Sequence, residues 1–167
     1  VRVSVFVSGC HHHCKGCFNE CAWDFGYGNK FDEDAKEKVI NYMNHDYIKG
    51  LSLLGGEPLE PSNQEGLLPL VKEVKEKFPD KTIWCYTGYD FQKDIVDGMN
   101  KTNPTTKELL KYIDVVVDGK FDENQKSPKL KFRGSANQRI LDAQETIKED
   151  KPVEIPSLYE KDRPTFK

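Results

Sequence analysis

The chain has 167 residues, of which 37% are hydrophobic and 32% charged, and its formal net charge is −3. This length corresponds to a single domain with one sizeable core. No apolar run approaches the roughly 18 residues of a membrane span, and nucleic-acid binding normally requires a basic surface. We therefore expect a soluble protein with neither a membrane nor a nucleic acid as its main partner.

The cysteines indicate the compartment. Four of the five lie close together, between Cys10 and Cys21. The chain opens directly on an alternating apolar strand, so no signal peptide is visible. Clustered thiols without such a leader are typical of a reducing environment. We therefore expect a cytoplasmic protein.

The most informative motif is a C-x3-C-x2-C loop formed by Cys10, Cys14 and Cys17, directly after the alternating strand at residues 1–7. Glycines near both ends of the loop let the three thiols converge on one centre. Thiolates are soft ligands that select zinc, cuprous copper or iron–sulfur clusters. The loop therefore predicts a metal centre at the end of the first strand.

Several kinds of centre fit the loop. A structural zinc site of the Cys3His type would use one of the histidines between Cys10 and Cys14, but no second Cys or Cys/His pair follows. A disulfide framework would require many more cysteines. A fourth ligand from Cys21 would make a closed, ferredoxin-like cluster. With three ligands only, one iron stays open for a substrate, and the loop alone does not separate these last two interpretations.

The rest of the chain alternates between strand and helix patterns. This alternation favours an α/β fold with a mostly parallel sheet flanked by helices over a hairpin at Asp118-Gly119. A capping box, Ser62-x-x-Glu65, is expected to start the second helix, and Cys85 is expected to be a buried thiol without a ligand role. The expected elements are a helix at 33–44, a strand at 51–54, a helix from residue 62, a strand at 82–87, helical pieces at 91–97 and 106–113, and a strand at 114–119.

Four strand exits carry chemically distinctive residues. They are the cysteine loop, Gly55-Gly56-Glu57-Pro58, Thr87-Gly88 and Asp118-Gly119. In a parallel α/β sheet, ligands bind beyond the carboxyl ends of the strands. We therefore expect these four segments to meet at one edge and form a site. Residues 120–139 are basic and rich in turns, and residues 148–167, with three prolines and alternating charges, are expected to form a tail.

The cysteine loop followed by Gly55-Gly56-Glu57-Pro58 resembles the radical SAM superfamily. More closely, the chain is similar to the activating enzymes of anaerobic (class III) ribonucleotide reductase, and the similarity extends over residues 1 to about 142. It implies a partial (β/α) barrel of the radical SAM type, with a core domain at residues 1–147 and a tail at 148–167. The stretches that carry it are Val3–Cys17, Tyr86–Gly88, Asp118-Gly119, Phe132–Ser135 and Asn137–Arg139.

The resemblance also implies a site. Three cysteines, Cys10, Cys14 and Cys17, would hold a 4Fe–4S cluster whose fourth iron is chelated by S-adenosylmethionine. The amino group of that cofactor would contact the motif residues Gly55, Gly56, Glu57 and Pro58. Its methionine and ribose groups would contact Thr87 and Asp118, and its carboxylate would contact Lys120.

The implied activity is reductive cleavage of S-adenosylmethionine and formation of a glycyl radical on anaerobic ribonucleotide reductase, with a low-potential donor such as flavodoxin. The partner would dock on basic residues, Arg133 and Arg139 together with Lys129 and Lys131. One alternative is a pyruvate formate-lyase activating enzyme, a family of usually longer chains. Alternatives of other classes are a small ferredoxin-like electron carrier and a zinc-binding interaction module.

Overall fold

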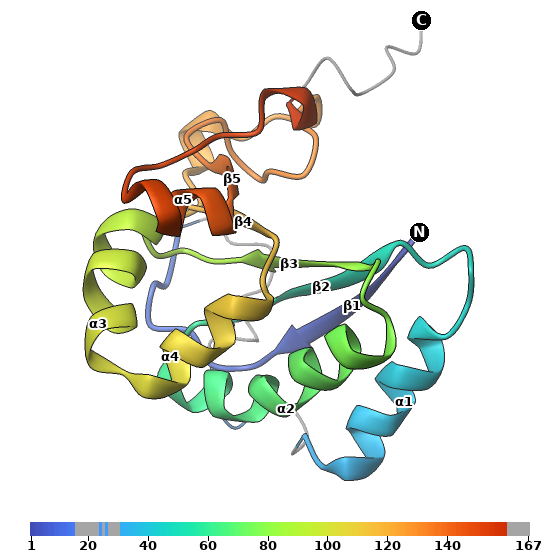
Figure 1. Ribbon diagram of the computed structural model, residues 1–167. Helices are drawn as coiled ribbons and strands as arrows, with labels where there is room; N and C mark the ends of the chain where they lie inside the picture. The colour runs from blue at the N-terminus through green and yellow to red at the C-terminus, as the bar shows by residue number, and fades with distance from the viewer. Residues whose placement is uncertain (16–23, 25, 27–30, 160–167) are drawn as a thin grey trace, which may run out of the picture.

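The computed structural model describes residues 1–15, 24, 26 and 31–159. These residues form a five-stranded sheet in the order β1-β2-β3-β4-β5 (Figure 1). The first four strands run parallel, and β5 is antiparallel to β4. The expected α/β fold with a mostly parallel sheet is thus confirmed. The strands are β1 (Arg2–Val7), β2 (Gly50–Gly55), β3 (Thr82–Tyr86), β4 (Val115–Asp118) and β5 (Arg139–Asp142).

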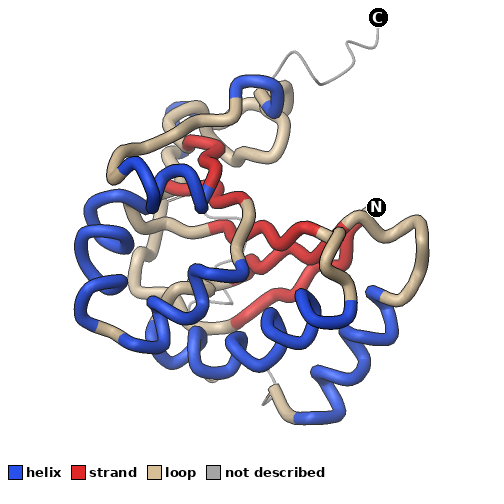
Figure 2. The backbone as a smooth tube through the Cα atoms, viewed as in Figure 1, coloured by secondary structure: helices blue, strands red, loops and turns tan. Residues whose placement is uncertain are grey.

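Helices connect the parallel strands, and α1, α2 and α4 lie on one side of the sheet (Figures 1 and 2). None of the helices that the structure describes is long and apolar enough to cross a bilayer. The longer helical segments are α1 (Glu33–Met43), α2 (Pro61–Lys77), the π-helix η2 (Phe91–Met99), α4 (Pro104–Leu109) and α5 (Ala143–Glu149). Short turns of helix are α3 (Asn100–Thr102), η3 (Leu110–Tyr112), η4 (Glu123–Gln125) and η5 (Pro156–Leu158).

The two faces of the sheet are buried by different parts of the chain, because side chains alternate along each strand. In β3, Ile83 and Cys85 point into the main core beneath the helices, and both are fully buried. Trp84 faces the opposite side, where it packs with Phe132 at a ring-centroid distance of 4.8 Å. The face opposite the helices is therefore covered in part by loops.

The helix boundaries follow local capping chemistry. Asp32 accepts a hydrogen bond from the Ala35 N–H and begins α1 at the expected position. Asn103 accepts one from the Thr105 N–H, and α4 begins at Pro104, two residues before the expected start. At the other end of α1, the Lys81 ammonium donates to the backbone oxygens of Met43 and His45.

The expected capping box in α2 is wrong. The helix begins at Pro61, one residue before Ser62, and its N-cap residue is Glu60, whose side chain makes no cap hydrogen bond. Pro61 takes the first helical position, where a missing N–H costs nothing. The Glu60 carboxylate binds the cysteine loop instead.

Residues 139–159 contain structure that the sequence pattern does not predict. The short strand β5 pairs with β4, and Asp142 caps α5 by accepting a hydrogen bond from the Glu145 N–H. The chain then returns along β5, where the Ile155 N–H donates to the Ile140 oxygen. Ile155, Leu158 and Tyr159 pack against the loop-covered face of the sheet. Part of the expected tail is thus attached to the sheet.

Candidate functional site

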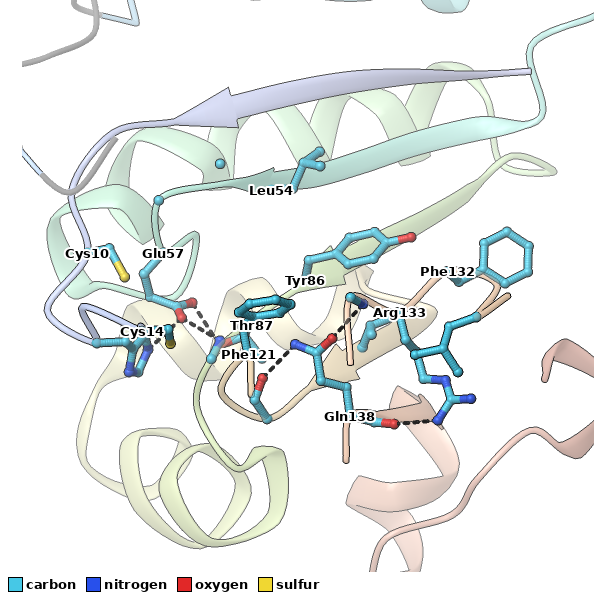
Figure 3. A pocket seen from close by; sticks show the side chains of 18 of the residues that line it. Cys10, Cys14, Leu54, Glu57, Tyr86, Thr87, Phe121, Phe132, Arg133 and Gln138 are labelled. Atoms are coloured by element: carbon cyan, nitrogen blue, oxygen red, sulfur yellow. Dashed lines mark hydrogen bonds and ion pairs between the residues drawn. The ribbon is translucent and has the colours of Figure 1, made fainter. Parts of the chain in front are cut away.

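A cavity of about 620 Å³ lies at the carboxyl ends of β1 to β4 (Figure 3). Cys10 and Cys14 are at one end of it, and Phe132 and Arg133 are at the other. All four predicted strand exits contribute: the cysteine loop, the motif Gly55–Glu57, Thr87-Gly88 and Gly119. The structure therefore brings these segments together, as expected from a parallel sheet.

Residues 119–138, which we call the roof segment, line the side of the cavity that lies opposite the sheet. The Gln138 side chain holds this segment together, because its Nε2 donates to the Gly119 oxygen and its Oε1 accepts from the N–H groups of Gly134 and Ser135. Apolar side chains of the roof segment face the cavity. The roof residues in the lining include Phe121, Pro128, Leu130 and Phe132.

The two described cysteines of the loop differ in exposure. Cys10 is 8% exposed, whereas Cys14 is half-buried. Burial raises the pKa of the Cys10 thiol, and the nearby Glu57 and Cys14 add to this shift, while hydrogen bonds from the backbone N–H groups of His12 and His13 oppose it. Cys17 and Cys21 lie outside the described residues. Within the described part of the chain, no three His, Cys, Asp or Glu side chains converge as a metal site.

The two glycines after β2 allow the motif to lie against the cysteine loop. Gly55 has a φ of +115°, and a Cβ there would lie 2.5 Å from the backbone N and O of Val7. This close approach lets the Gly56 N–H donate to the Val7 oxygen and the Glu57 N–H donate to the Gly9 oxygen, each at 2.7 Å. The motif is therefore tied by its backbone to the segment that leads into Cys10.

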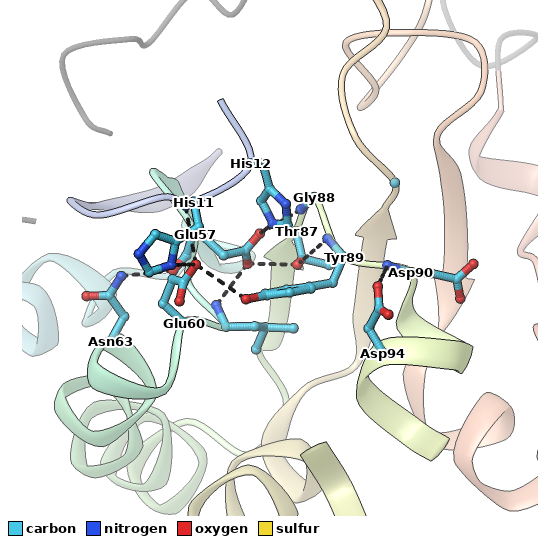
Figure 4. Close-up of polar contacts among 12 residues, drawn as sticks. His11, His12, Glu57, Glu60, Asn63, Thr87, Gly88, Tyr89, Asp90 and Asp94 are labelled. Carbon is cyan, nitrogen blue, oxygen red and sulfur yellow. Dashed lines mark hydrogen bonds and ion pairs between the residues drawn. The ribbon is translucent and has the colours of Figure 1, made fainter. Parts of the chain in front are cut away.

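Glu57 is fully buried, and its carboxylate accepts four hydrogen bonds within the chain (Figure 4). Oε1 accepts from His12 Nε2 and from the Gly88 N–H, both at 2.7 Å. Oε2 accepts from the Thr87 hydroxyl at 2.7 Å and from the Leu59 N–H at 2.9 Å. These four donors satisfy the carboxylate, as a buried charged group requires.

A second buried carboxylate, that of Glu60, holds the neighbouring histidine (Figure 4). Its Oε1 lies 3.0 Å from His11 Nδ1 and accepts at 3.3 Å from the Tyr89 hydroxyl. Burial raises the pKa of Tyr89 well above its usual range, and the charges of Glu60 and Glu57 add to the shift. Asn63 completes this contact region, because its Nδ2 donates to the oxygens of Ser8 and Glu57.

The other predicted contacts of S-adenosylmethionine lie at varied distances from the cavity. Thr87 lines it, and its hydroxyl also accepts a hydrogen bond from the Tyr89 N–H. Asp118 and Pro58 are both buried. Neither is among the lining residues, and exposed Lys120 lines a smaller neighbouring pocket.

The two arginines expected to dock a partner have partners within the chain. Arg139 pairs with Asp118, and this contact raises the pKa of the guanidinium. Arg133 donates to the backbone oxygens of Ala136 and Gln138, and its guanidinium lies 4.6 Å from the centre of the Tyr159 ring. Both arginines therefore help to hold the roof segment and β5.

Sequence reasoning missed the roles of His11, His12, Glu60 and Asn63. The three consecutive histidines at 11–13 were a visible signal, but we considered them only as possible ligands of a zinc site. The partners of His11 and His12 are carboxylates from the region after β2, 49 and 45 residues away in the sequence. Such pairings depend on the parallel β1–β2 register and have no local signature.

The described residues suit an iron–sulfur cluster. Cys10 and Cys14 both line the cavity (Figure 3), and the backbone N–H groups of His12 and His13 oppose the rise of the Cys10 pKa caused by burial. Soft thiolates with N–H donors around them are the usual surroundings of such clusters. Cys17 would supply a third thiolate from the same loop.

Comparison with known proteins agrees with this donor set. Residues 1–141 match the model of the 4Fe-4S single cluster domain family, which supports an iron–sulfur cluster as cofactor. The anaerobic ribonucleoside-triphosphate reductase-activating protein of Haemophilus influenzae is 47% identical over 141 residues, which cover 83% of this chain and 86% of the relative. Proteins of the same name from Enterobacteria phage T4 and Escherichia coli K12 are 42% and 39% identical, and each match covers 83% of this chain and 82% and 86% of the respective relative.

No solved structure matches the chain significantly. The family match and the level of identity to these relatives confirm the resemblance seen in the sequence. The chain, whose residues 1–141 match the 4Fe-4S single cluster domain, therefore belongs to the family of anaerobic ribonucleoside-triphosphate reductase-activating proteins.

Proposed function

We propose that this protein is a radical SAM activase that generates a glycyl radical on an anaerobic ribonucleotide reductase. The observation that carries the proposal is the convergence of the cysteine loop, the Gly55–Glu57 motif and two further strand exits on one cavity. The names of the relatives, which describe activation of such a reductase, support the choice of partner.

The cysteine loop would hold the cluster through Cys10, Cys14 and Cys17. When bound, the cluster would supply the electron that cleaves S-adenosylmethionine to methionine and a 5′-deoxyadenosyl radical, which takes a hydrogen atom from a glycine of the reductase. A low-potential donor such as flavodoxin would provide that electron. The protein would work in the reducing cytoplasm, where the thiolates stay available.

The motif at residues 55–58 would bind the amino acid end of S-adenosylmethionine. The backbone oxygens of Gly55 and Gly56 would carry this contact, because the Glu57 carboxylate already has four donors and the Glu57 oxygen accepts from Asn63. Glu57 and Pro58 would then shape the site rather than supply its charge. We keep Thr87, Asp118 and Lys120 as proposed contacts of the methionine, ribose and carboxylate groups.

The sheet would form a partial (β/α) barrel of the radical SAM type, with residues 1–147 as its core domain and residues 148–167 as a tail. The parallel strands β1 to β4 and the helices on one side of them support this assignment. The cavity would then lie on the inner face of the barrel, under the roof segment. The apolar side chains of the roof segment would help to exclude water from the cavity, which prevents side reactions of a radical.

The partner would reach the cavity beside the roof segment. Arg133 and Arg139 remain candidates for docking, but their contacts within the chain make charge reversal there a poor test of binding. Lys129 and Lys131 belong to the same segment, and Lys129 is exposed. Lys129→Glu is therefore the cleaner variant, and we expect it to weaken coupling to the reductase.

The proposal can be tested by anaerobic reconstitution with iron and sulfide. We expect a cluster whose reduced-state electron paramagnetic resonance spectrum changes when S-adenosylmethionine is added. A reduced cluster that does not respond would favour a closed, four-cysteine electron carrier. A colourless protein that retains zinc would favour the interaction module.

A further inference from the structure

His12 joins the two segments that form the end of the cavity nearest the cysteines. Its Nε2 lies 2.7 Å from Glu57 Oε1, and the two side chains are 8% and 1% exposed. The Glu57 carboxylate also accepts three further hydrogen bonds, from Leu59, Thr87 and Gly88. The hydrogen bond to this fixed, buried carboxylate restricts the orientation of the His12 ring.

The His12 ring also packs closely against its neighbours Gly88 and Tyr89. A Cβ at Gly88 would lie 2.6 Å from His12 Cδ2, so the ring packs directly against the backbone of the strand exit after β3. The Tyr89 ring meets it edge-on, with centroids 4.6 Å apart. Packing and hydrogen bonding therefore fix the same orientation of His12 (Figure 4).

Glu57 forms hydrogen bonds with residues on both sides of Cys10. Its backbone N–H binds the oxygen of Gly9, one residue before the cysteine, and its carboxylate binds His12, two residues after it. Between these two points, the backbone N–H groups of His12 and His13 lie near the Cys10 sulfur and oppose the rise of its pKa caused by burial. The side-chain contact of His12 thus also places a donor on a cluster ligand.

We infer that His12 is a positioning residue through which Glu57 fixes the conformation of residues 9–13 around Cys10. This inference rests on the proposed cluster, but the contacts that carry it lie within the chain. The motif expected to bind S-adenosylmethionine would then also shape the surroundings of the cluster. Glu60 would support the same loop from its outer side through His11.

The expected consequence is a change in cluster properties. Hydrogen bonds to cluster sulfurs stabilise the more negative, reduced state and so raise the reduction potential. Without the Glu57 contact, the backbone N–H groups of His12 and His13 would no longer be held near the Cys10 sulfur. The potential would then shift to more negative values, and the cluster would be lost more readily.

Two substitutions at His12 separate the effect of its hydrogen bond to Glu57 from the effect of its size. His12→Leu removes the hydrogen bond and keeps an apolar side chain, whereas His12→Gln places an amide N–H near the position of Nε2. We expect His12→Leu to bind iron about 10- to 100-fold more weakly in competition with a chelator, as is typical when a residue supporting a ligand is replaced. We expect His12→Gln to recover most of this loss, and His45→Gln, at an exposed histidine far from the loop, to change nothing.

The reduction potential of the reconstituted cluster, measured without S-adenosylmethionine or reductase, gives the second readout. It should shift negatively in His12→Leu and return in His12→Gln. Glu57→Ala should produce the same shift, and the double variant should add little to it, because both substitutions break one contact. Melting curves of the metal-free proteins identify any variant that has simply failed to fold.

A third readout needs no cluster. In the metal-free protein, alkylation of Cys10, followed by mass spectrometry of its peptide, should be faster in His12→Leu than in the wild type and slow again in His12→Gln. This pattern supports the inference even if no cluster forms, a result that would sink the proposed function alone. Equal alkylation rates in all three folded proteins would overturn the inference, and so would a His12→Gln variant as impaired as His12→Leu.

Discussion

The guanidinium of Arg139 and the carboxylate of Asp118 form a two-pronged ion pair across β4 and β5, with Nε to Oδ1 at 3.0 Å and a terminal nitrogen to Oδ2 at 2.6 Å. The carboxylate is 1% exposed, and its Oδ2 also accepts from the Phe91 N–H at the start of η2. One pair therefore links the antiparallel edge of the sheet to the strand exit beside the cavity. Each member was expected to bind a different partner, but in the structure they bind each other.

We predict that Arg139→Gln destabilises the protein by about 2 to 3 kcal/mol, because it leaves the buried Asp118 without its counter-charge. The value lies below that of a fully buried pair because Arg139 is 31% exposed and water can replace part of the contact. Urea unfolding measures the change. Lys129→Gln, at an exposed position of the roof segment, is the control, and an equal, small effect in both variants would contradict this role.

The backbone contact between β1 and β2 gives a second prediction. Gly55→Ala should prevent the close approach to Val7, because the added Cβ would lie 2.5 Å from backbone atoms at a φ that alanine rarely adopts. We expect loss of soluble protein or a strongly lowered melting temperature. Gly66→Ala is the matched control, since its Cβ in α2 would meet nothing within 4 Å.

That control should stabilise the helix by about 0.5 to 1 kcal/mol. A Gly55→Ala protein that melts like the wild type would show that the two segments do not lie as close as described.

Cys85 gives a prediction for pH dependence. Burial raises the pKa of this thiol well above its ordinary value, and the charge of Glu57 adds to the shift. The unfolded thiol ionises near pH ~8.5, so its stabilising contribution is complete below that pH and is lost as the pH rises towards the folded-state pKa. The stability advantage of the wild type over Cys85→Ala should therefore shrink by up to about 1.4 kcal/mol per pH unit above about pH 9.

Urea unfolding at pH values of about 7.5, 9 and 10 measures this difference, and other groups that titrate in the range cancel because both proteins contain them. An advantage that stays constant across the series would show that Cys85 ionises equally well in the folded protein.

Much of the site could be predicted from the sequence because the end of each strand is marked by the residues next to it in the chain. An apolar run followed by Gly55-Gly56, or by Thr87-Gly88, marks the end of a strand, and parallel pairing then brings these ends to one edge. The buried state expected for Cys85 followed from its place inside such a run and is confirmed.

The remaining features depend on contacts between distant residues. β5 has only four residues and is held by β4 on one side and by Ile155 on the other, so its own pattern is too short to identify it. The expected start of α2 at the Ser62 capping box is wrong because Pro61 takes the first helical position, and the Glu60 carboxylate binds His11 instead of capping the helix. The expected ligand Cys17 and the fourth-ligand candidate Cys21 lie outside the described residues, so their roles stay predictions.

Those roles can be tested by ligand substitution. We predict that Cys10→Ala, Cys14→Ala and Cys17→Ala each abolish the cluster and the activity, because a site with three ligands cannot lose one. Cys21→Ala and Cys85→Ala should keep both. Iron and sulfide per chain after anaerobic reconstitution provide the measurement, and loss of the cluster in Cys21→Ala would indicate a closed four-cysteine site.

The central claim is that this protein generates a glycyl radical on a partner protein, the anaerobic ribonucleotide reductase. The direct measurement is electron paramagnetic resonance of an anaerobic mixture of the reduced protein, S-adenosylmethionine and a class III ribonucleotide reductase. We predict a glycyl radical doublet on the reductase that disappears when S-adenosylmethionine is omitted. Cleavage of S-adenosylmethionine without any radical on the reductase would contradict the activase assignment, and a doublet that forms only on pyruvate formate-lyase would assign the protein to that enzyme instead.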